Sequence, residues 1–168
     1  VADRKAFTPS TIYWFEGNVG PGPDGMLYAG NDDFRVYSLT PEGELRWSAL
    51  TGLHIWGAPG FRGDVAYVSS FDMHVHALRR SDGATLWRCF VGDFIASSPA
   101  VDDEGRVFVG AFDGSIVAID GDRGRILWRR PTGGPVYASA AITPDGALCI
   151  GSGDGTIRSL DRATGEPR

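Results

Sequence analysis

The amino-acid sequence predicts an all-β fold, a β-propeller with four blades of four antiparallel strands per chain. Three observations support this prediction. Trp47, Trp87 and Trp128 stand 40 and 41 residues apart, and the sequence around them aligns in register. Short strand-like segments recur roughly every 10 residues with turn residues between them. Glycine makes up 24 of the 168 residues, which is about twice the usual share of roughly 7% and is typical of many tight turns.

The first clear strand of each repeat is an apolar run that ends on glycine or serine. The four runs are residues 26–30, 65–69, 106–110 and 147–151. A turn follows each run, and in the last two repeats it carries the pairs Asp113–Gly114 and Asp154–Gly155. Because Asp-Gly between two apolar runs favours a type I′ turn, we predict a hairpin here.

An alternating strand follows each hairpin. These strands span residues 35–39, 74–78, 115–119 and 156–160, and each leads to a polar turn that contains glycine. The next strand carries the tryptophan, which is large enough to pack one blade against its neighbour. We therefore assign blade packing to the residues in this column, namely Phe7, Trp47, Trp87 and Trp128.

We predict that residues 1–168 form a single domain. Its repeats span about residues 8–47, 48–87, 88–128 and 129–168. Residues 2–7 align with the outer strand at residues 82–87, so we expect residues 1–7 to close the last blade as its outer strand. This alignment of the first residues with an outer strand permits a closed four-bladed ring. It equally permits two chains that form an eight-bladed ring as a homodimer by strand exchange at the blade edges. A chain that begins with Val1 is expected to be a processed protein or a piece of a longer one.

Composition excludes several classes of function. The net charge is −5 and no basic run is present, so nucleic acid is not an expected partner. No apolar run approaches the roughly 20 residues of a membrane-spanning helix. Cys89 and Cys149 fit neither a disulfide framework nor a metal-binding spacing, and we expect two small buried residues. We predict no metal and no cofactor.

The best copies of the repeat contain Phe108–Gly110, Asp113–Gly114 and Trp128, and again Gly151, Asp154–Gly155 and Thr164–Gly165. This pattern resembles the pyrroloquinoline-quinone (PQQ) type propeller repeat over nearly the whole chain. The family includes quinone-dependent alcohol dehydrogenases, the barrel-assembly lipoprotein of the outer membrane, and sensor domains of bacterial kinases. The resemblance implies the blade architecture and favours the cell envelope or periplasm. The dehydrogenases carry an adjacent cysteine pair and a calcium site with Glu, Asn and Asp. This sequence has no Cys-Cys pair and no Asp-rich calcium loop, so the resemblance argues against quinone chemistry.

The loops that enter each blade differ most between the repeats. Their third column is uniformly apolar, with Phe15, Ile55, Ile95 and Val136, and we expect it to be core between blades. Alternation then directs the neighbouring residues toward the axial channel and its mouth. The candidate binding residues are Trp14, Glu16, His54, Trp56, Phe94 and Tyr137. Such an aromatic mouth with a carboxylate suits a ligand or peptide, but the same rings would also serve to plug the channel.

Other polar motifs have simpler interpretations. His74 and His76 alternate on one strand near Asp72, and we expect a surface pair at a partly exposed position with no third metal ligand. Residues 151–155 resemble a phosphate loop but fall in the register of a blade hairpin. The hairpin aspartates, Asp33, Asp72, Asp113 and Asp154, could form an acidic rim for a cation or a basic partner.

Taken together, these patterns predict a non-catalytic scaffold that binds a protein or peptide partner through the channel mouth. No nucleophile elbow or catalytic triad pattern is present in the sequence. Two alternatives stay open, a small-ligand or sensor domain and a fragment of a larger quinoprotein.

Overall fold

In the computed structural model, which describes residues 19–168, every regular element is a β-strand. The first sheet contains β1 (Gly20–Pro21), β2 (Leu27–Gly30), β3 (Arg35–Leu39) and β4 (Leu45–Leu50). The second contains β5 (Gly60–Arg62), β6 (Val65–Ser69), β7 (His74–Arg79) and β8 (Thr85–Phe90). The third contains β9 (Ala100–Val101), β10 (Arg106–Gly110), β11 (Ser115–Asp120) and β12 (Arg125–Pro131). The fourth contains β13 (Ala141–Ile142), β14 (Ala147–Gly151) and β15 (Ile157–Asp161). We call these sheets blades one to four.

Each blade is an antiparallel meander in which every strand pairs with the next one along the chain. The all-β propeller architecture predicted from the repeat is therefore confirmed. Within the described residues, blade four has three strands, and only an isolated bridge between Leu160 and Pro167 begins a fourth. The predicted closing strand, residues 1–7, lies outside the described part of the chain.

The core lies between neighbouring blades. Tyr28 and Val36 of blade one pack against Ile55, Val68 and Leu78 of blade two, and two further clusters of the same kind join blades two and three and blades three and four. Tryptophan contributes to each joint through its ring and its indole N–H. The three indoles donate to a carbonyl of the following blade, with Trp47 bonded to Arg80 at 2.8 Å, Trp87 to Gly121 at 2.9 Å and Trp128 to Arg162 at 3.0 Å.

The hairpins differ from the predicted type I′ turn. In the third blade, Gly114 N donates to Ala111 O and Ala111 N donates to Ser115 O, and only Gly114 has a positive φ, of 84°. This is a type I turn that ends in one left-handed residue, the three-residue hairpin loop. Asp113 favours it because its carboxylate accepts the N–H of Ser115 at 2.8 Å, which holds the aspartate in a right-handed turn.

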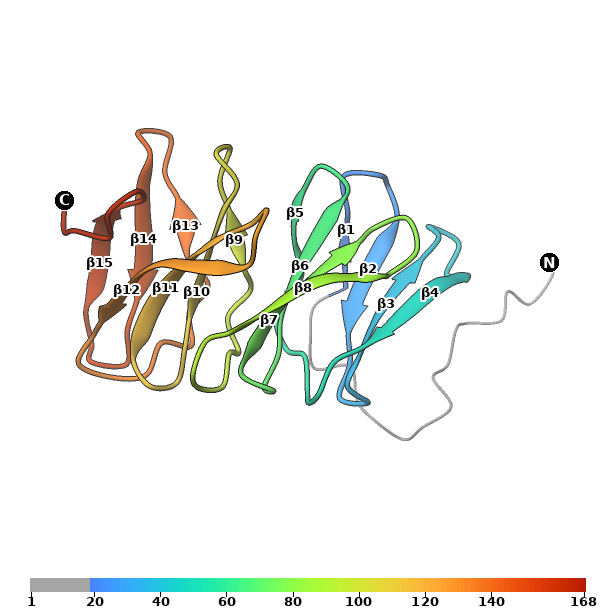
Figure 1. Cartoon of the computed structure of the whole chain (residues 1–168), viewed down its shortest axis with the longest axis horizontal. Helices are drawn as coiled ribbons and strands as arrows, with labels where there is room; N and C mark the ends of the chain where they lie inside the picture. The colour runs from blue at the N-terminus through green and yellow to red at the C-terminus, as the bar shows by residue number, and fades with distance from the viewer. Residues whose placement is uncertain (1–18) are drawn as a thin grey trace.

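The four blades follow one another along the molecule, and β1–β4 and β13–β15 lie at opposite ends (Figure 1). The described residues therefore form an open row of blades, so they do not close a four-bladed ring. The hairpins between the second and third strands and the loops that enter blades two to four lie along one edge, at the bottom of Figure 1. This edge brings most of the aromatic candidates together.

Candidate functional site

The loops that enter blades two to four are each fixed to the hairpin of the same blade. Phe71 N donates to His54 O at 3.0 Å in blade two, and Phe112 N donates to Phe94 O at 3.0 Å in blade three. Gly153 N makes the corresponding bond to Pro135 O at 2.7 Å in blade four. Because these bonds fix the backbone on both sides, the aromatic residues at these positions are held on a rigid edge.

Seven rings contact one another along this edge, and we call them the aromatic chain. Its members are Phe34, His54, Trp56, Phe71, Phe94, Phe112 and Tyr137. Phe71 lies at the centre, with ring centroids 4.4 Å from Trp56, 5.6 Å from Phe94 and 5.5 Å from Phe112. Phe112 in turn meets the Tyr137 ring edge-on at 4.6 Å. Such edge-to-face and tilted contacts are favourable for aromatic pairs, so the chain extends across blades one to four as one surface.

The aromatic chain has a buried centre at Phe71, and some of the rings around it are exposed. Phe71 is 9% exposed, whereas Trp56 is 40% exposed and Tyr137 is 54% exposed. Asp32 supplies the carboxylate of this surface, since its Oδ1 lies 3.2 Å from Trp56 Nε1 and 3.3 Å from His54 Nδ1. The arrangement offers flat apolar rings beside a hydrogen-bond acceptor, which suits an apolar or aromatic side chain with a donor next to it.

Of the six residues that the sequence singles out for binding, four lie in the aromatic chain: His54, Trp56, Phe94 and Tyr137. The other two, Trp14 and Glu16, lie outside the described residues, as does Phe7. Sequence reasoning missed Asp32, Phe34, Phe71 and Phe112. The signal was available, because Phe71 and Phe112 share one alignment column in the hairpin that faces the entering loop.

The histidine pair is not the exposed surface pair that the sequence predicts. His76 is buried, and its Nε2 lies 2.8 Å from Asp72 Oδ2. Burial raises the pKa of Asp72, but hydrogen bonds from His76, the charge of that ring and the N–H groups of Gly52 and His74 outweigh it and lower the pKa to about 2. The prediction failed because β7 is flanked by both neighbouring blades, which bury side chains on either face of it. Asp72 and His76 thus form a structural pair.

The other hairpin aspartates are also used within the fold. Asp154 accepts hydrogen bonds from Thr156, Gly133 and Arg158, which hold its pKa well below the ordinary value. Asp113 pairs with Arg129, and Asp33 accepts the N–H of Arg35. Since internal donors engage all four carboxylates, the structure gives the proposed acidic rim no open carboxylate row.

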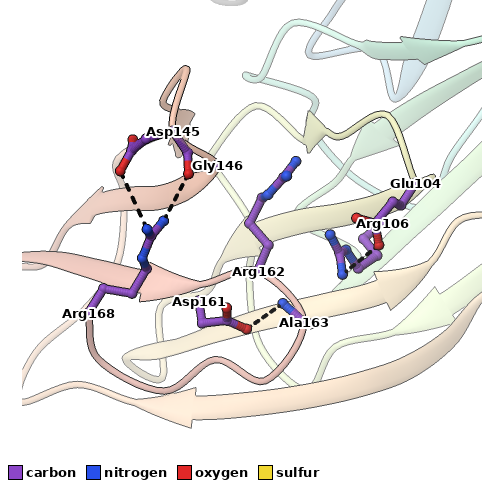
Figure 2. A pocket seen from close by; sticks show the side chains of 8 residues that line it. All are labelled: Glu104, Arg106, Asp145, Gly146, Asp161, Arg162, Ala163 and Arg168. Atoms are coloured by element: carbon purple, nitrogen blue, oxygen red, sulfur yellow. Dashed lines mark hydrogen bonds and ion pairs between the residues drawn. The ribbon is translucent and has the colours of Figure 1, made fainter.

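A polar pocket of about 330 Å³ lies at the outer turns of blades three and four (Figure 2). Its arginines already have carboxylate partners. Arg106 Nε lies 2.7 Å from buried Asp102, Arg162 lies 3.0 Å from Asp103, and Arg168 lies 3.5 Å from the carboxylate of Asp145. The pair of Arg162 with Asp103 connects the two blades, whereas the other two pairs lie within one blade, so the arginines of this pocket serve the fold.

The described residues contain no group of three or more His, Cys, Asp or Glu placed to hold a metal ion. Cys89 lies on β8 and Cys149 on β14, both with free thiols, so the adjacent cysteine pair of the quinone dehydrogenases is not formed. The residues present therefore do not fit a quinone site of that kind. None of the described elements is a helix long and apolar enough to cross a bilayer.

The family model described as "Outer membrane protein assembly factor BamB" matches residues 6–93 and 72–168. Among solved structures, BamB from Moraxella catarrhalis superposes with a TM-score of 0.71 at 20% identity, covering 96% of this chain and 62% of BamB. The chain thus spans less than two thirds of the length of BamB. The computationally designed Ika4 protein superposes with a TM-score of 0.78 at 16% identity, covering 94% of this chain and 95% of Ika4. At these identities the two structures show the fold alone. No curated protein sequence matches the chain.

Proposed function

Because the chain belongs to the family of the outer membrane protein assembly factor BamB, we propose that it is a non-catalytic scaffold that binds a protein or peptide partner along the aromatic chain. One observation carries this proposal. Trp56 and Tyr137 expose large rings that are backed by the packed rings of Phe71 and Phe112. Rigid, well-supported aromatic side chains are typical of the residues that dominate protein–protein affinity.

The polar groups beside Trp56 support a proposal for the side chains of the partner. Asp32 is the carboxylate beside Trp56, so a basic side chain or a backbone N–H of the partner would find an acceptor there. An apolar or aromatic side chain would stack on Trp56, and a cation could lie over the same ring. We therefore expect a segment with an aromatic or aliphatic residue next to lysine or arginine.

Selection from a random peptide library on the immobilised chain tests this proposal. We expect the selected peptides to be rich in aromatic and basic residues, and Trp56→Ala to weaken their binding by at least about 30-fold, the effect of a hot-spot residue worth about 2 kcal/mol. Leu86→Ala is the matched control, because Leu86 is 44% exposed and lies on β8. Peptides that bind the Trp56→Ala variant as tightly as the parent chain, or a selection that yields no binder, would contradict the proposal.

A further inference from the structure

The face of blade four that points away from blade three is built like a joint, but no residue in the described part of the chain covers it. Val36, Val75 and Ile116 occupy one position of the third strand in blades one to three, and each is 0% exposed because the next blade covers it. Ile157 occupies the same position in blade four and is 84% exposed. The other joints bury a β-branched apolar residue at this position.

A glycine column supports the same conclusion. A Cβ on Gly30 would lie 2.3 Å from Ile55 Cγ2, and a Cβ on Gly110 would lie 2.1 Å from Val136 Cγ1, so the next blade approaches closely over both glycines. On Gly151, the nearest atom to such a Cβ is Ala138 Cβ at 3.8 Å. Blade four keeps the small residue that admits a neighbour, but no neighbour is there among the described residues.

A backbone hydrogen bond is also left open. Ala58 N donates to Ser98 Oγ at 2.9 Å between blades two and three, and Ser98 N donates to Ser139 Oγ at 2.9 Å between blades three and four. Ser139 N is the next donor in this series and has no partner in the described part of the chain. The end face therefore presents an apolar contact, a close-approach site and a donor in the spacing of an internal joint.

Blade one carries the complementary half of a joint. Gly83, Gly124 and Gly165 each lie under the tryptophan ring of the preceding blade, with a Cβ on them falling 2.6–2.8 Å from that ring. Gly43 holds the same place in blade one with a φ of 88°, and nothing described lies within 4 Å of its Cβ position. The residue of the tryptophan column that would precede blade one is Phe7.

We propose that a second copy of this chain covers the end face of blade four. Blade one of the second copy packs on Ile157 and Gly151, so that its open site over Gly43 lies in the same joint. The reciprocal joint forms at the other end, which gives a two-fold dimer with one ring of eight blades. A second copy is favoured over closure within one chain because blades one and four lie at opposite ends of the molecule (Figure 1).

Light scattering on a sizing column, over a range of concentrations, tests the dimer. We expect the full chain to elute with about twice its mass of 18.0 kDa. Ile157→Arg should fold with an unchanged circular dichroism spectrum, because Ile157 is exposed in the single chain, but it should elute at the mass of one chain. Ile126→Arg is the matched control: Ile126 is 40% exposed on β12 of a blade flanked on both sides, so the dimer should persist.

A second variant tests the joint without adding charge. Gly151→Leu adds bulk where the single chain has open space, and where the dimer would bring the second copy within contact distance. We expect it to lower the dimer fraction as Ile157→Arg does. Three results would overturn the proposal: a single-chain mass for the parent at every concentration, dimers that survive both substitutions, or masses that grow beyond two chains, which would indicate an open polymer. None of these results bears on peptide binding at the aromatic chain, so the two proposals fail separately.

Discussion

Blades three and four have closely similar local structure but different surroundings. In both, the second and third strands pair over five residues with the same register, from Arg106–Asp120 to Gly110–Ile116 in blade three and from Ala147–Asp161 to Gly151–Ile157 in blade four. Ile116 is nevertheless completely buried, whereas Ile157 is largely exposed. The strands of a blade are therefore specified within its own repeat, whereas the adjacent blade buries its faces.

The largest difference is expected for alanine substitutions at the two isoleucines. Ile116→Ala removes buried apolar volume between blades three and four and should lower the free energy of unfolding by about 2–5 kcal/mol. Ile157→Ala in the single chain should change it by less than about 0.5 kcal/mol. Urea unfolding measures the free energy of unfolding of both variants. Ile157→Ala is measured on the monomeric Gly151→Leu background. Equal losses would show that the end face is covered within one chain.

The glycine column provides a second comparison, in which the substitutions add side-chain volume instead of removing it. Gly110→Ala introduces a Cβ that collides with Val136, so we expect a destabilisation of about 1–3 kcal/mol. Gly151→Ala meets only Ala138 at van der Waals distance in the single chain, so on the monomeric Ile157→Arg background it should be nearly neutral, with a small gain from reduced freedom of the unfolded chain. Thermal unfolding of the two variants side by side measures the difference, and a neutral Gly110→Ala would contradict the close approach of blade four.

The hairpin aspartates should differ in their contribution to acid stability. The pKa of Asp72 is about 2 in the folded protein and 3.8 ordinarily, so its carboxylate stabilises the fold by about 2 kcal/mol above pH of about 4, and this is lost as the pH falls through about 2. Asp72→Asn should remove this contribution and flatten the pH dependence between those values.

Asp154→Asn in blade four is the comparison for that experiment. Its partner Arg158 is partly exposed, so the loss at neutral pH should be smaller. Urea titrations at pH 3 and pH 7 separate the two variants. An Asp72→Asn variant with the full acid sensitivity of the parent would show that the buried pair with His76 is not its source.

The smallest effect concerns the left-handed residue of the hairpins. Met73 has a φ of 68° in blade two, where blades three and four place Gly114 and Gly155. Because a side chain in the left-handed region costs roughly 1–2 kcal/mol, Met73→Gly should raise stability by up to about 1 kcal/mol. Gly155→Ala has open space around its Cβ position and should lower stability by about the same amount. Differential scanning calorimetry resolves both shifts, and a destabilising Met73→Gly would mean that contacts of the methionine side chain outweigh the backbone strain.

The sequence predicted the strands and their grouping into blades, because period-2 alternation, glycine turns and the tryptophan spacing are local signals. It also placed His54, Trp56, Phe94 and Tyr137 in one loop register, and these four residues lie together in the aromatic chain. It did not give the hairpin type, since Asp113 can adopt either hand and its hydrogen bond to Ser115 decides between them. It missed Phe71 and Phe112, because the contact between a hairpin and the loop entering the same blade depends on tertiary packing.

By itself, the sequence determined the identity and order of the blades, since each one forms from a contiguous repeat whose pairing partners are close in the chain. The tertiary structure decided which faces are covered. His76 is buried because two blades flank its strand, and Ile157 is exposed because, among the described residues, blade four has a neighbour on one side alone. Burial depends on what stands opposite a residue, and residues far apart in the sequence, or on another chain, supply that surface.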